Sequence, residues 1–132
     1  MKKNALALAI ALALSACSAP PLEAVQASLR LLLVSLLESK GQAVLRRALQ
    51  HYEEGDYATA ETSLREALEL GLEPGDRVLA HKTLAFINCA TERMQECRMQ
   101  FQLALRADPK TELDAAEAGH PVWGAVFRSL VR

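Results

Sequence analysis

The feature that most restricts the fold of this chain is a pattern of small and large apolar residues that recurs 37 positions later. The corresponding pairs are Ala48 with Ala85, Ala60 with Cys97, Leu64 with Phe101, and Ala67 with Ala104. Antiparallel helices approach each other closely only where small side chains meet. We expect such contacts between Ala48 and Ala60 and between Ala85 and Cys97. The pattern therefore predicts two helical hairpins, at about 42–73 and 76–109.

Turn-forming residues support these bounds. Gly55 tolerates backbone angles closed to other residues, so it is the expected turn of the first hairpin. Pro74 and Gly75 are expected to break the helical pattern between the hairpins, and Asp76 is the expected N-cap of the next helix. Pro109 ends the second hairpin, because proline cannot continue a helix.

The spacing of these residues resembles the tetratricopeptide repeat, a family of paired-helix units of about 34 residues. The better-matching copy contains Leu84-Ala85, Cys97, Phe101, Ala104-Leu105 and Asp108-Pro109. The chain departs from the family at Val44 and His81, where the repeat has an aromatic residue, and at Arg47, where it usually has leucine. The resemblance implies an all-α solenoid of two repeats, with an unrelated four-helix bundle as the alternative. Because a solenoid needs about three repeats, the flanking segments must act as caps.

The flank before the repeats is rich in leucine. Its apolar residues at helical spacing are Leu22, Val25, Leu29, Leu32 and Leu36. They predict a helix that begins the domain at 22–132. We expect this helix to pack on the domain rather than to lie on a membrane surface, because Arg30 is its only basic residue before Lys40.

The flank after the repeats has two parts. Residues 113–121 lack apolar periodicity and are expected to form a linking loop. A capping helix is expected at about 121–132, beginning at Pro121, a residue favoured in the first helical position. We expect Trp123 to pack against Phe101 or its neighbours, and Tyr57 and Phe101 to fill the gaps between successive hairpins.

The N-terminus has the pattern of a secretory signal peptide. Lys2 and Lys3 precede an apolar run from Ala5 to Leu14, which is too short to span a bilayer. Leu14-Ser15-Ala16-Cys17 resembles the lipobox of bacterial lipoproteins. The resemblance implies a signal peptide at 1–16, lipidation of Cys17, and a stiff tether at 17–21. The alternative is an ordinary cleaved signal with Cys17 close to the cut.

The two remaining cysteines form an even pair. Export would place Cys89 and Cys97 in an oxidising compartment, where disulfides form and persist. Cys89 is expected near the end of one helix and Cys97 one turn into its partner. We therefore predict a disulfide between them, with two buried free thiols as the alternative.

The sequence lacks the patterns of common enzyme and cofactor sites. It has neither a nucleophile turn nor a phosphate-binding loop. His81, Cys89 and Cys97 lack the paired spacing of a zinc site, and Asp114 and Glu117 are interpreted as solvated surface acids. The net charge of −1 argues against nucleic acid as a partner. We expect no enzyme activity, no cofactor and no metal.

A further resemblance bears on function. Its residues are Leu84-Ala85-Phe86-Ile87-Asn88-Cys89 and Gly119-His120-Pro121-Val122-Trp123-Gly124. Together with the repeat and lipobox, they resemble small tetratricopeptide lipoproteins associated with bacterial type VI secretion. This implies an accessory envelope protein, and by resemblance Ser18 implies the outer membrane, with the domain facing the periplasm.

The expected activity is that of an adaptor that binds a protein component of an envelope assembly. The first helices of the hairpins would present an outward face, made of Leu45, Leu49, Tyr52, Lys82 and Phe86. The alternative is that these residues pack against the flanking helices. The alternative function is a structural lipoprotein that stabilises the outer membrane or binds peptidoglycan.

Overall fold

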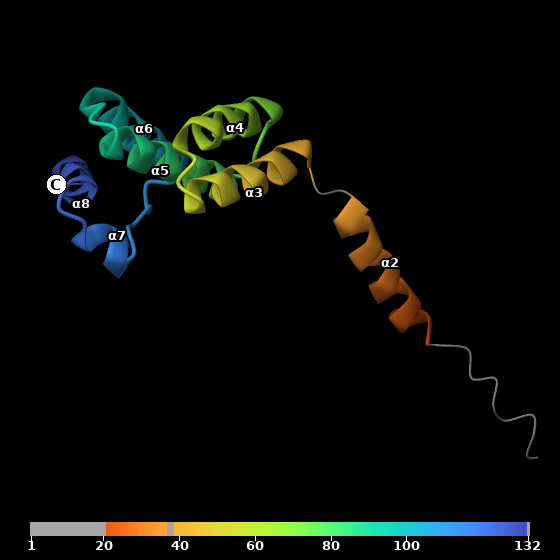
Figure 1. The fold of residues 1–132 in the computed structure, drawn as a ribbon. Helices are drawn as coiled ribbons and strands as arrows, with labels where there is room; N and C mark the ends of the chain where they lie inside the picture. The colour runs from red at the N-terminus through yellow and green to blue at the C-terminus, as the bar shows by residue number, and fades with distance from the viewer. Residues whose placement is uncertain (1–20, 37–38, 132) are drawn as a thin grey trace, which may run out of the picture. The chain divides into compact units, whose positions relative to one another are not determined.

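The computed structural model describes residues 21–36 and 39–131, and within these ranges the chain forms helices and no strands (Figure 1). The helices are α2 (Leu22–Leu36), α3 (Lys40–Glu53), α4 (Tyr57–Leu70), α5 (Pro74–Ala90), α6 (Met94–Ala107), α7 (Ala115–Gly119) and α8 (Trp123–Leu130). The predicted all-α class is confirmed. The predicted signal peptide and Cys17 lie outside the described residues.

The helices belong to two compact units, of which one contains α2 and the other contains α3 to α8. Helix α2 begins directly after Pro21, whose carbonyl accepts a hydrogen bond of 2.8 Å from the Ala24 amide. Among the described residues, no helix combines the length and the apolar character that a membrane crossing requires. The predicted packing of the leucine-rich helix on the domain stays a prediction.

The second unit contains two antiparallel helical hairpins, α3–α4 and α5–α6 (Figure 1). Their turns have the same backbone hydrogen bonds at the predicted offset: the Gly55 amide donates to the Tyr52 carbonyl, and the Glu92 amide donates to the Cys89 carbonyl. Gly55 has φ +80° and Glu92 has φ +61°, so both turns use the left-handed region. The internal repetition of a helical hairpin therefore extends to the backbone.

Small residues let the helices of each hairpin approach. Ala48 and Ala60 are fully buried in one core cluster, between α3, α4 and α5. Ala85 and Cys97 are fully buried in a second cluster, between α5, α6 and α8. Phe101 is also fully buried there, as predicted for a residue that fills the gap beside its hairpin.

The prediction for Tyr57 is wrong. This residue begins α4 at the hairpin turn and is 37% exposed. Its ring lies 5.7 Å from that of Tyr52, centroid to centroid, instead of filling a gap between the hairpins.

The boundary between the hairpins also differs from the prediction. Gly71, with φ +95°, ends α4, and Pro74 begins α5 rather than breaking a helix. Glu73 is the N-cap of α5, and Asp76 lies in its first turn. The Asp76 carboxylate accepts a hydrogen bond of 3.1 Å from Gln42 Nε2 of α3. Asp76 therefore connects two neighbouring helices instead of capping one.

The C-terminal segment is more ordered than the expected loop. Residues 115–119 form α7, which begins with a reciprocal capping box between Asp114 and Glu117. Helix α8 begins at Trp123 rather than at Pro121, and it packs against α5 and α6. Helix α5 packs against α3 and α4 in the same way. Helix α8 therefore covers the second hairpin as α5 covers the first, while its role as the cap of a solenoid stays a prediction.

Candidate functional site

Two of the five predicted partner-binding residues are buried. Leu45 is 4% exposed and packs in the core cluster of α3, α4 and α5. Phe86 is 6% exposed and packs in the second cluster, whose members come from α5, α6 and α8. The prediction that these two side chains face outward is wrong, because neighbouring helices cover them. Leu49, Tyr52 and Lys82 are half-buried.

An aromatic stack joins α5 to the C-terminal segment. The ring of Phe86 lies 5.1 Å from that of Trp123, and the rings of Trp123 and His120 are stacked 3.2 Å apart, centroid to centroid. Phe86 also meets Phe101 edge-on at 5.8 Å. Trp123 therefore packs on a neighbour of Phe101, as predicted, and His120 covers one face of its indole ring.

An ion pair anchors α7 to α5. Lys82 Nζ lies 2.7 Å from Glu117 Oε2, and their side chains are only 14% and 22% exposed. Lys82 Nζ also donates to the Glu112 carbonyl and lies 6.0 Å from the Phe86 ring centroid. Glu117 is therefore not the solvated surface acid that the sequence suggested. We call Lys82, Phe86, Glu117, His120 and Trp123 the C-terminal cluster.

Tyr52 connects the hairpins to this cluster. It comes from α3 and packs against both core clusters. Burial, followed by the electrostatic effects of Tyr57 and Glu117, raises the pKa of its hydroxyl above the ordinary value.

Two buried polar atoms lack a hydrogen-bond partner within the described part of the chain: Trp123 Nε1 and Asn88 Oδ1. The Asn88 side chain is fully buried, and its Nδ2 donates to the Leu84 carbonyl at 2.7 Å. Asn88 Oδ1 therefore accepts no hydrogen bond from the described residues, and the surrounding helices exclude solvent from it.

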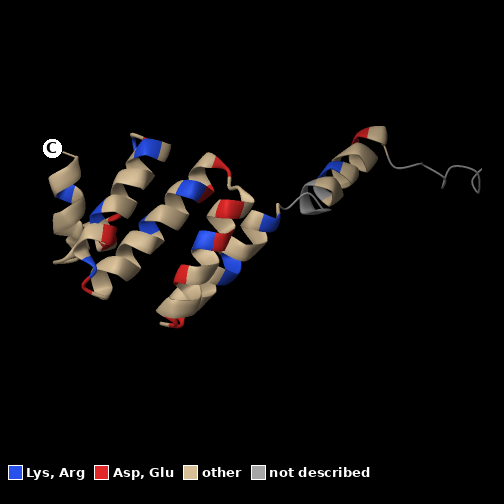
Figure 2. Cartoon of the chain, turned by 90° about the horizontal axis from the view of Figure 1, so that it is seen from above, with Lys and Arg blue, Asp and Glu red and all other residues tan. Residues whose placement is uncertain are grey.

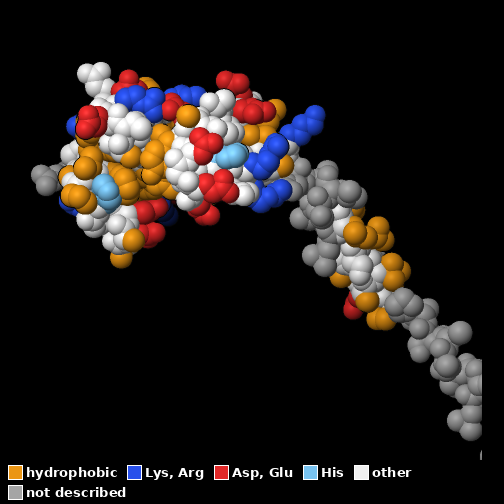
Figure 3. Space-filling view, viewed as in Figure 1, with side chains coloured by type: hydrophobic (Ala, Val, Ile, Leu, Met, Phe, Trp, Pro, Cys, Tyr) orange, Lys and Arg blue, Asp and Glu red, His pale blue; other side chains and the backbone are white. Residues whose placement is uncertain are grey.

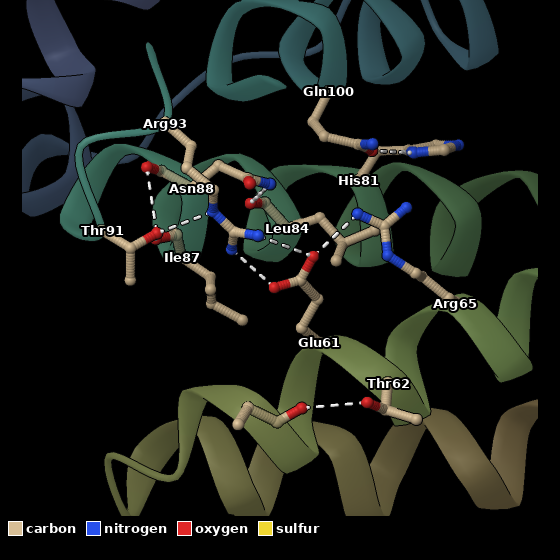
Figure 4. A network of polar contacts seen from close by, with 11 residues as sticks. Glu61, Thr62, Arg65, His81, Leu84, Ile87, Asn88, Thr91, Arg93 and Gln100 are labelled. Atoms are coloured by element: carbon tan, nitrogen blue, oxygen red, sulfur yellow. Dashed lines mark hydrogen bonds and ion pairs between the residues drawn. The ribbon is translucent and has the colours of Figure 1, made fainter. Parts of the chain in front are cut away.

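A separate polar network holds the two hairpins together (Figure 4). Glu61 of α4 accepts hydrogen bonds from Arg93, in the turn between α5 and α6, and from Arg65 of its own helix. The hydrogen bond from Arg93 is the main reason why the pKa of Glu61 is lowered, and burial opposes it. The network joins α4 to the turn between α5 and α6, and its single carboxylate is paired with two guanidinium groups.

His81 is also part of an interhelical contact. Its Nδ1 lies 2.8 Å from Gln100 Oε1 of α6, and burial is the main cause that lowers the pKa of its imidazole (Figure 4). Within the described residues, no group of three or more His, Cys, Asp and Glu side chains could hold a metal ion.

The predicted disulfide between Cys89 and Cys97 is present, with the two sulfurs 2.07 Å apart and the Cα atoms 5.2 Å apart. It joins the end of α5 to the first turn of α6, so the alternative of two free thiols is wrong. The bond lies in the second core cluster, beside Phe86 and Phe101.

Sequence reasoning missed α7 and its contribution to the site. The only local signal is the pair Asp114 and Glu117, whose spacing is that of a capping box. The contact between Glu117 and Lys82 joins positions 35 residues apart and has no local signal.

Comparison with protein-family models found no matching family, and comparisons with curated proteins and with solved structures found no match either.

Proposed function

We propose that the protein is a lipid-anchored adaptor of the tetratricopeptide kind, which holds a protein component of an envelope assembly at the periplasmic face of the outer membrane. The observation that supports this most is the repeated hairpin with α8 as a cap. Stacked helical hairpins present a continuous surface from corresponding helices, and such surfaces commonly bind protein segments.

The proposed binding surface consists of Leu49, Tyr52, Lys82, His120 and Trp123. It replaces the surface expected from sequence, since Leu45 and Phe86 are buried. Figure 3 shows hydrophobic side chains gathered over the middle of the second unit. Aromatic and apolar groups beside the ion pair of Lys82 and Glu117 suit an extended or helical peptide that is mainly apolar.

The charge distribution supports a protein rather than a polyanionic partner. Figure 2 shows basic and acidic residues interspersed on α3 and α4. The exposed Arg47 and Glu53 of α3, for example, have opposite charges. Nucleic acids bind to surfaces with a clear basic excess, and the chain as a whole has a net charge of −1.

The anchor is proposed from the lipobox-like residues that end at Cys17. The Cys17→Ala variant should leave the outer-membrane fraction or stay unprocessed. Fractionation identical to that of the wild type would contradict the lipid anchor. The link with type VI secretion is proposed on the resemblance of the second hairpin and of the segment 119–124.

Capture of envelope proteins by the purified chain would test the binding surface. We expect the double variant Tyr52→Leu and Lys82→Met to lose its partner, since it removes a hydroxyl and a charge while keeping apolar volume. Arg106→Met is a matched control, because Arg106 is exposed on α6 and lies outside the proposed surface. Undiminished capture by a double variant with wild-type circular dichroism and melting temperature would refute the proposed surface.

A further inference from the structure

Helix α2 has an apolar face that is exposed among the described residues of its own unit. The exposed fractions are 73% for Leu22, 39% for Val25, 52% for Leu29, 62% for Leu32 and 51% for Leu33. Glu23 and Arg30 are its only charged residues. Exposed leucines in this number mark a surface that has an apolar partner, because leaving them in water is unfavourable.

The length of α2 limits what that partner can be. Its 15 residues extend over roughly 22 Å, whereas the hydrocarbon core of a bilayer is about 30 Å thick. A helix of this length and composition is suited to lie along a membrane interface, with its apolar side directed toward the acyl chains.

The short separation of α2 from Cys17 in the sequence specifies the partner. This step depends on the lipidation put forward under Proposed function. Four residues, Ser18 to Pro21, separate Cys17 from the first residue of α2. Even a fully extended chain keeps Leu22 within roughly 17 Å of the lipidated cysteine. Contact between α2 and the lipid surface is then intramolecular, at a high effective concentration.

We propose, in place of the packing on the domain expected from sequence, that α2 is a second membrane contact of this protein and lies in the interface of the leaflet that holds the Cys17 lipid. The near absence of basic residues, which disfavours a free peripheral helix, is compatible with this role. A covalent anchor supplies the attraction that basic residues otherwise provide, so the contact is apolar. It should therefore depend little on anionic lipid and on salt.

A second copy of the chain is a less suitable partner for the same face. A coiled coil of two heptads is short, and isolated helices of about this length are marginal in water. Helix α2 has only Glu23 and Arg30 with which to form ion pairs beside such a seam.

Tryptophan fluorescence in reconstituted vesicles would test the proposal. The full lipidated protein would be placed in vesicles of phosphatidylethanolamine, with and without phosphatidylglycerol, that contain brominated acyl chains. A single tryptophan would be introduced as Leu29→Trp in a Trp123→Phe background. The matched control is Ala27→Trp, because Ala27 lies two residues away, about 200° around the helix.

We expect brominated lipid to quench the Leu29→Trp protein several-fold more than the Ala27→Trp protein, in both lipid mixtures. Replacing Leu22 and Leu32 with Gln should lower the fraction of α2 that is bound to lipid by at least about tenfold, and the quenching should fall with it.

The outcomes separate α2 from the anchor. Vesicle-bound protein with equally weak quenching at both positions overturns the proposal for α2 and leaves the lipid anchor standing. Protein that does not associate with vesicles overturns both. A Leu29→Trp protein that is shielded from lipid and forms a dimer in detergent, which Leu22→Gln disrupts, shows a second copy on the face and overturns the proposal.

Discussion

Replacing Gly41 with alanine tests the close approach inside the first hairpin. Gly41 is buried in the first turn of α3, and a Cβ placed on it would lie 2.3 Å from the Gly71 carbonyl oxygen and 3.1 Å from that of Ala67. Both atoms belong to backbone, so no side chain can rotate away to make room. Gly75, in the first turn of α5, is a matched control, because a Cβ there meets no atom within 4 Å.

The two substitutions should have opposite effects on stability. Alanine is favoured over glycine in a helix by about 0.5–1 kcal/mol, and this gain applies to both positions. At Gly41 the added methyl group also causes overpacking, which costs about 1–3 kcal/mol. We therefore expect Gly41→Ala to lower the free energy of unfolding by about 1–2 kcal/mol, and Gly75→Ala to raise it by about 0.5 kcal/mol.

Urea unfolding of the purified protein, followed by far-ultraviolet circular dichroism, would measure both values. For a domain of this size, a loss of 1 kcal/mol corresponds to a decrease in melting temperature of roughly 4–8 °C. If Gly41→Ala is at least as stable as the wild type, or if Gly75→Ala is destabilised equally, the close approach of α3 to the end of α4 is refuted.

Three further predictions concern the packing, the disulfide and the interhelical ion pair. Ala60→Leu and Ala104→Leu should each lower the free energy of unfolding by about 1–3 kcal/mol, and unchanged melting temperatures would contradict small-residue packing. Reduction of Cys89–Cys97 should lower the free energy of unfolding by about 2 kcal/mol, and thiol titration of the unreduced, denatured protein should find both cysteines blocked. Because the pKa of Glu61 is lowered, its contribution is present above the ordinary glutamate pKa and lost as pH falls through the lowered value. Glu61→Gln should therefore be less stable than the wild type at pH 7, and urea midpoints at falling pH should converge.

The hairpins could be predicted because their signals are local. Ala48, Ala60, Ala85 and Cys97 mark where helices meet, and Gly55 marks a turn that needs a positive φ. These residues lie close to one another in the sequence. Over a short segment, the helical period tells which residues share one face of a helix. The disulfide was predicted from the export signal, from the even number of remaining cysteines, and from their positions on either side of one hairpin turn.

The candidate site depended on contacts that no local pattern contains. The sequence placed Leu45 and Phe86 on the correct helices, but whether they face solvent depends on which elements pack over those helices. The packing of α5 against α3 and of α8 against α5 decided this.

The sequence by itself therefore determined the helical hairpins, the offset between them, the pairing of the cysteines and the presence of a helix near the C-terminus. The tertiary structure alone decided which side chains of the first helices are exposed, and it brought Glu117 to Lys82 and Trp123 to Phe86. The physical reason is that periodicity specifies the apolar side of a helix, whereas exposure depends on the neighbours that cover that side, and these come from distant parts of the chain.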